Sequence, residues 1–229
     1  MGHRFIIETI MNPLCILFLH HQDDILTNYH YNLIKQFNPA TPVIALTFNL
    51  GLSHAIKLSI PLPTDRLRAE WRDVDKLIYA WFLSQETIVA ERYLILESDT
   101  LCNMPAQEFY SSVWDKPSSG ACIRTLKTNP KLWILREIKQ PHLYNGFLLA
   151  VTPICGILLS YEAIKAIALL SQDPKYDPLF SETRIGTLLA ESNNVPTVIF
   201  PRIDHYISWR PREPKGPGIW HSVKRICLV

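Results

Sequence analysis

The sequence lacks a strong excess of charge of either sign. Its 23 lysines and arginines and its 21 aspartates and glutamates leave a net charge of +2. Because no strong overall field attracts such a chain to a polyanion, we expect no nucleic-acid partner. The basic residues gather only locally, which favours a site for a small anion: Arg66, Arg68, Arg72, Arg210, Arg212, Lys215, Lys224 and Arg225.

Paired cysteines and long apolar segments are missing as well. The five cysteines form no C-x-x-C pair and lie mostly in apolar runs, a pattern typical of buried free thiols in a reducing compartment. The longest apolar stretch, Ile154 to Leu170, is interrupted by Glu162 and Lys165, so we expect no stable membrane insertion. The first ten residues carry charges and no apolar core, which predicts no secretory signal and a cytoplasmic protein.

Internal repeats and low-complexity segments are absent too. A chain of 229 residues with 48% hydrophobic residues can bury a sizeable core in one domain. We therefore expect a single domain that spans residues 1–229.

Three short apolar runs predict buried strands: Leu14–Leu19, Val43–Phe48 and Tyr93–Leu96. Between the first two runs, apolar residues at helical spacing predict a helix through Phe37: Leu26, Tyr29, Leu33 and Phe37. Asp23 or Asp24 would cap this helix, and Asn38-Pro39 would end it. A strand, a helix and a strand with short links predict a parallel sheet.

The other segments predict a mixture of helices and strands. We expect helices at Arg68–Ser84, Ala106–Trp114, Leu158–Leu170 (capped by Ser160) and Ser181–Glu191 (capped by Ser181), and strands at Ala121–Leu126, Phe147–Val151 and Val195–Phe200.

The strand predicted at Tyr93–Leu96 leads directly into Glu97-Ser98-Asp99. Ligands of open α/β sheets collect at the carboxyl ends of such strands, so both carboxylates should reach the rim of a pocket. Two hard oxygen ligands there suit Mg²⁺ or Mn²⁺. The alternative is an acidic loop at the end of a strand.

The order of these features resembles the GT-A glycosyltransferases, which depend on nucleotide sugars. Glu97-Ser98-Asp99 is similar to the aspartate-x-aspartate motif of that family, and the strand, helix and strand from Leu14 to Phe48 occupy the same place in the order. His221 and Lys224, in Trp-His-Ser-Val-Lys, are similar to the family's late histidine and lysine, and Pro153–Leu170 to its acceptor region.

The resemblance implies an α/β fold of the GT-A (Rossmann-like) type, with a mostly parallel central sheet and helices on both faces. It implies a nucleotide-binding half at about 12–100 and an acceptor half at about 101–229 with a metal- and phosphate-binding tail. The implied activity is a metal-dependent, hexosyltransferase-like transfer from a UDP-sugar, or else a GDP-sugar, to an unknown acceptor hydroxyl.

The resemblance also implies roles for individual residues. Mn²⁺ or Mg²⁺ would bind Asp99 and His221, with Glu97 as a third ligand or a ribose contact. The nucleotide sugar would contact His20, His21, Asp75, Arg68, Arg72, Ser98 and Lys224. A solvated helix face explains the two arginines as well, and a surface ion pair explains Asp75. Glu182 is the candidate base of an inverting reaction, unless it only complements a helix dipole.

Two other functions fit parts of the sequence. His21-Gln22-Asp23-Asp24 resembles the His-x-Asp-Asp signature of zinc-dependent sugar de-N-acetylases, although Ile25 replaces the usual acidic follower and no His-x-x-His lies downstream. A nucleotide-sugar-binding domain without turnover is the other alternative.

Overall fold

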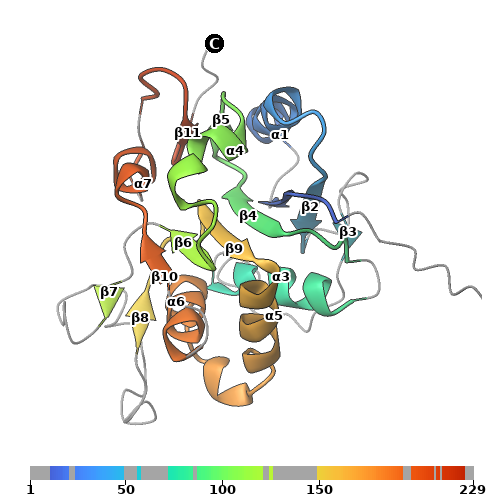
Figure 1. Ribbon diagram of the computed structural model, residues 1–229, viewed down its shortest axis with the longest axis vertical. Helices are drawn as coiled ribbons and strands as arrows, with labels where there is room; N and C mark the ends of the chain where they lie inside the picture. The colour runs from blue at the N-terminus through green and yellow to red at the C-terminus, as the bar shows by residue number, and fades with distance from the viewer. Residues whose placement is uncertain are drawn as a thin grey trace, which may run out of the picture.

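The computed structural model describes residues 11–20, 24–48, 56–57, 72–84, 87–120, 124–125, 149–192, 197–208, 210–211 and 213–224. These residues form one seven-stranded sheet between two helical layers, with two small two-stranded sheets at its margins (Figure 1). No helix among the described residues has the length and apolar character needed to cross a membrane.

The central sheet has the strand order β10-β6-β9-β4-β1-β2-β3. Strand β4 lies at its centre, and its neighbour β1 pairs in parallel with both β4 and β2. Strand β9 runs antiparallel to both of its neighbours, β4 and β6, so the sheet is mostly parallel with one reversed strand. The strands are β1 (Cys15–Leu19), β2 (Val43–Thr47), β3 (Ile56–Lys57), β4 (Arg92–Glu97), β6 (Ser118–Gly120), β9 (Ile157–Ser160) and β10 (Thr197–Ile199).

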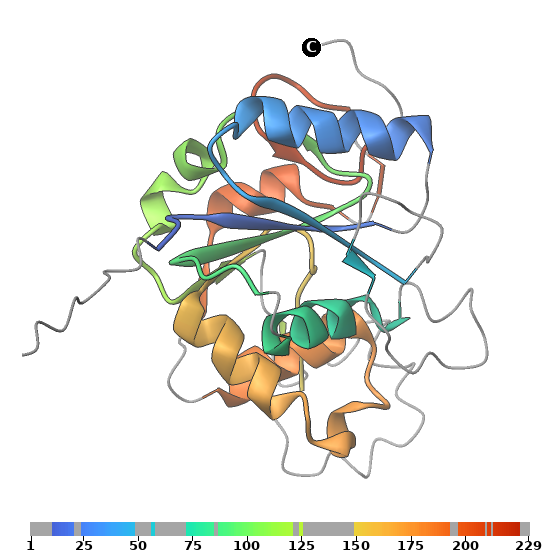
Figure 2. The same cartoon turned by 90° about the vertical axis from the view of Figure 1, so that its right-hand side faces the viewer.

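Helices cover both faces of this sheet (Figure 2). Four segments pack over one face of the strands: α1 (Ile25–Phe37), α4 (Ala106–Phe109), the 3₁₀ turn Ser111–Val113 and α7 (Pro201–Tyr206). On the other lie α3 (Val74–Leu83), α5 (Tyr161–Leu170), the 3₁₀ turn Pro174–Tyr176 and α6 (Ser181–Glu191). The expected α/β sheet with two covered faces is confirmed.

The apolar strands divide the core into two clusters because successive side chains of a strand point to opposite faces. In β1, Leu17 faces the cluster of α3, α5 and α6, while Ile16 and Phe18 face the cluster beneath α4 and α7. In β4, Ile95 and Leu96 divide in the same way. A strand buried on both faces has no polar position, which explains the uninterrupted apolar runs.

Several predicted boundaries are wrong. The segment from Leu158 begins as strand β9, and the helix starts only at Tyr161, although Ser160 does cap it by accepting a bond from the amide of Ala163. Phe180, not Ser181, caps α6. Strand β6 (Ser118–Gly120) lies just before the strand predicted at Ala121–Leu126. Within that predicted strand, Arg124–Thr125 forms the short strand β7, which pairs with β8 (Ala150–Val151).

Helix α1 begins at Ile25 because the Asp24 carboxylate accepts a bond of 2.7 Å from the amide of Thr27. Its buried residues are Thr27, His30, Leu33 and Ile34, so its inner face is rotated from the predicted stripe. A prediction based on the spacing of apolar residues misses the polar residues of that face, chiefly His30.

Candidate metal and phosphate site

The site begins where β4 ends. Glu97 is the last residue of the strand, and a tight turn follows, in which the amide of Thr100 donates to the carbonyl of Glu97 (3.0 Å). The Thr100 hydroxyl in turn accepts from the amide of Glu97 (3.2 Å). This turn holds Glu97 and Asp99 at the carboxyl edge of the sheet, as their sequence position predicts.

The C-terminal segment reaches the same edge through a short antiparallel pair. Strand β11 (Ile219–Trp220) pairs with β5 (Leu101–Cys102), in the register Ile219 to Cys102 and Trp220 to Leu101. The pairing continues past the strand, because the amide of Val223 donates to the carbonyl of Asp99 (2.8 Å). Main-chain bonds therefore bring His221 beside a motif more than a hundred residues upstream.

His221 lies between the two carboxylates. Its Nε2 is 3.1 Å from Oε2 of Glu97 and 3.0 Å from Oδ1 of Asp99, and its side chain is only 10% exposed. Burial by itself would lower the pKa of His221, but the bonds to Asp99 and Glu97 and the charge of Glu97 raise that pKa to about 12. The imidazolium cation thus bridges the two carboxylates.

Asp99 has two further donors, both from the C-terminal segment. The hydroxyl of Ser222 and the ammonium of Lys224 donate to its Oδ2. Burial would raise the pKa of Asp99, yet the bonds from His221, Lys224 and Ser222 outweigh it and hold the pKa far below its usual range. Asp99 is therefore fully ionised at neutral pH and can act as a metal ligand.

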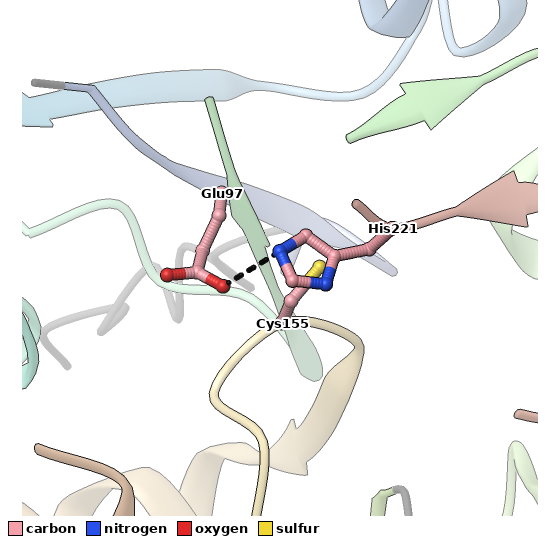
Figure 3. Close-up of side chains that lie close together, drawn as sticks. All are labelled: Glu97, Cys155 and His221. Carbon is pink, nitrogen blue, oxygen red and sulfur yellow. Dashed lines mark ion pairs between the residues drawn. The ribbon is translucent and has the colours of Figure 1, made fainter. Parts of the chain in front are cut away.

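Cys155 is a third group beside Glu97 and His221 (Figure 3). A ligand atom from each of these three residues lies within 4.8 Å of the other two. Burial raises the pKa of the Cys155 thiol to about 11, so it is protonated when no metal is bound. No sequence pattern indicates this role, because Cys155 lies in an ordinary apolar run.

A second residue that the sequence reading missed supports the motif from α1. Nδ1 of the buried His30 lies 3.0 Å from the carbonyl oxygen of Ser98. Burial lowers the pKa of His30, so the ring is neutral at neutral pH and donates from Nδ1 to this carbonyl. His30 therefore positions the turn that carries Glu97 and Asp99.

The other residues expected to contact a nucleotide sugar lie in varied places. Asp75 is completely buried and bonded to Arg184, as a buried rather than a surface ion pair. His20 is also buried, with its ring 5.8 Å from that of Phe18. Arg72 donates to the carbonyl of Pro178 and lies over the ring of Phe180, whereas His21 and Arg68 fall outside the described residues.

Glu182 lies in the first turn of α6, partly exposed. Its carbonyl accepts from the amide of Thr152 (3.2 Å), three residues before Cys155. The start of α6 therefore touches the loop that carries Cys155. The role of Glu182 as a base stays a prediction.

The donor set fits a divalent cation of the Mn²⁺ or Mg²⁺ class. Its two carboxylates are oxygen ligands of the kind that such ions prefer, and Nε2 of His221 lies within 3.1 Å of an oxygen of each. Lys224, with 61% of its side chain exposed, adds a positive charge at the mouth of the site.

Comparisons with known proteins add little. No family model matches the chain, and no curated protein matches it. Among solved structures, the galactosyltransferase LgtC bound to donor and acceptor sugar analogues is similar, with 11% identity, a TM-score of 0.37 and coverage of 74% of this chain and 68% of the other. An active-site mutant of LgtC is similar too, with 13% identity, a TM-score of 0.39 and coverage of 79% and 72%.

Proposed function

We propose that this protein is a divalent-metal-dependent glycosyltransferase that moves a sugar from a nucleoside diphosphate to an acceptor hydroxyl. The observation that carries the proposal is the meeting of Glu97 and Asp99 with His221 and Lys224 at the carboxyl edge of the sheet. A metal site beside an exposed cation suits a diphosphate, whose charge must be neutralised as it leaves.

Asp99, His221 and Glu97 would hold Mn²⁺ or Mg²⁺, which supplies Lewis-acid neutralisation of the diphosphate when bound. Lys224 would release its bond to Asp99 and donate to a phosphate oxygen instead. Ser222 and the main chain of Val223 keep Asp99 oriented during this exchange. A UDP-sugar is the favoured donor and a GDP-sugar the second choice.

For an inverting reaction, Glu182 is the candidate base that accepts the proton of the acceptor hydroxyl. A retaining reaction needs no such base. The anomeric configuration of the product, read by proton NMR, separates the two. Loss of turnover in Glu182→Gln together with an inverted product supports the base, and a retained product rules it out.

Among the described residues, nothing specifically favours either of the two alternatives from the sequence. The Asp24 carboxylate caps α1, while His21 and Asp23 lie outside the described residues. A binding domain without turnover would show donor affinity but no donor hydrolysis, which the following assay detects.

The test is a panel of UDP- and GDP-sugars, assayed for hydrolysis and transfer with and without Mn²⁺. We expect at least one donor to be consumed only with metal, and Asp99→Asn to abolish this activity. Asp115→Asn is the matched control, because Asp115 is an exposed carboxylate that pairs only with Lys116 among the contacts described. Activity that survives Asp99→Asn, or that needs no divalent ion, would contradict the proposal.

A further inference from the structure

Three ligand atoms that lie within 4.8 Å of one another are not those of Glu97, Asp99 and His221. They belong to Glu97, Cys155 and His221, so the thiol takes the place that the sequence assigns to Asp99. One carboxylate oxygen, one nitrogen and one sulfur form the kind of donor set that zinc accepts, whereas Mg²⁺ prefers oxygen alone.

The fold holds the sulfur firmly in this place. Cys155 is completely buried in the turn before β9. The next residue, Gly156, has a φ of 81° and donates from its amide to the carbonyl of Ile95 (2.7 Å). The phenol of Tyr110 donates to the carbonyl of Gly156 (2.9 Å). The main chain on which Cys155 lies is thus bonded to β4, the strand that carries Glu97.

A hydrogen bond also orients the sulfur itself. Sγ of Cys155 lies 3.1 Å from the hydroxyl oxygen of Thr100, in the turn after Glu97. Such contacts in the outer shell fix the direction of a metal ligand. On the other side, Nδ1 of His221 is buried and has no hydrogen-bond partner among the residues that the structure describes, so no bond at this nitrogen fixes the ring.

A tetrahedral ion would fit these three atoms once any separation wider than its own ligand spacing shortens. Bonds of about 2.0–2.3 Å place tetrahedral ligand atoms roughly 3.3–3.8 Å apart, and the three atoms here lie within 4.8 Å of one another. The fourth position stays open for water or a phosphate oxygen.

We propose that Glu97, Cys155 and His221 form a site for a thiophilic divalent cation, Zn²⁺ or Cd²⁺, with the Cys155 sulfur as a ligand. Binding displaces the thiol proton and the imidazolium proton to solvent. Because two of the ligands also belong to the Mn²⁺ set, the two kinds of ion exclude one another. This inference does not depend on glycosyl transfer, since it concerns metal binding alone.

The test uses Co²⁺ and Cd²⁺ as spectroscopic probes of the full chain under argon. With one equivalent of Co²⁺ we expect a thiolate-to-cobalt charge-transfer band in the near ultraviolet, which Zn²⁺ removes. Cadmium NMR of the wild type should show the downfield shift of a sulfur-ligated ion. This measurement needs no variant, so it decides the question even where a substitution at Cys155 prevents folding.

Variants assign the sulfur. Cys155→Ser should lose the band and bind Zn²⁺ at least about tenfold more weakly, with little change in Mn²⁺ affinity measured by electron paramagnetic resonance. Cys102→Ser is the matched control, because Cys102 is an equally buried free thiol in the same core cluster, and it should keep the band.

Two results would overturn the inference: a wild-type protein without a sulfur-ligated spectrum, or a band that persists in Cys155→Ser. Failure of the proposed function is a separate outcome. Sulfur ligation without any donor turnover would refute the transferase and leave this site standing, and Mn²⁺-dependent transfer without sulfur ligation would do the reverse.

Discussion

Replacing Arg184 by methionine tests the buried charge cluster that anchors α6. The Arg184 side chain is 1% exposed and bonded to Asp75 (2.6 Å) and Asp73 (2.8 Å). It also donates to the carbonyl of Tyr176 (3.0 Å) and to that of Leu179. Methionine fills a similar volume without these bonds, and it leaves the carboxylate of Asp75 buried and unpaired.

The expected cost at neutral pH is about 3–5 kcal/mol of unfolding free energy, the range found when one partner of a buried pair is removed. Burial already raises the pKa of Asp75 to about 6, against the opposing charge of Arg184. Without that charge the pKa rises further, and the folded Arg184→Met variant holds a proton on Asp75 that the unfolded chain releases. Its stability therefore falls as pH rises through neutrality.

The assay is urea denaturation followed by circular dichroism at pH 7 and pH 8. Asp75 is ionised at both values in the wild type, so the variant should lose up to about 1.4 kcal/mol more than the wild type over this interval. Adding Asp75→Asn to Arg184→Met should remove that pH dependence. The exposed Lys165→Met is the control and should change stability by less than about 0.5 kcal/mol. A cost below about 1 kcal/mol for Arg184→Met, or an unchanged pH slope, would refute the reasoning.

Three further results are expected. Mn²⁺ affinity should rise with pH, by up to about tenfold per pH unit between pH 6 and 8. The reason is that the metal must displace the proton that His221 holds with a pKa of about 12. An affinity that does not change with pH in electron paramagnetic resonance titrations would contradict this. His221→Ala should reduce Mn²⁺ affinity at least about tenfold, while His205→Ala, which removes an exposed histidine outside the ligand set, should leave it unchanged. Gly186→Ala should cost about 1–3 kcal/mol, since its Cβ would meet the carbonyl oxygen of Ala150 at 2.6 Å; thermal unfolding unchanged from the wild type would show that β8 gives way.

The strands of the sheet's centre could be predicted because each one is a purely local pattern. Cys15–Leu19 and the Tyr93–Leu96 part of β4 are buried on both faces, so they tolerate no charged residue and stand out in the sequence. Strand β9 could not be found in this way. Its apolar residues continue into the apolar face of α5, and only the pairing with β4 separates the strand from the helix.

The same difference between local patterns and long-range contacts applies to the site. The sequence by itself determined that Glu97 and Asp99 end a central strand, because strand burial and the position of ligands in α/β sheets are general physical rules. It also put forward His221 and Lys224, by resemblance. Only the tertiary structure placed these residues together, through the β5–β11 pair, and only it added Cys155 and His30. The register of distant strands and the packing of a turn depend on contacts between remote segments, which no local pattern encodes.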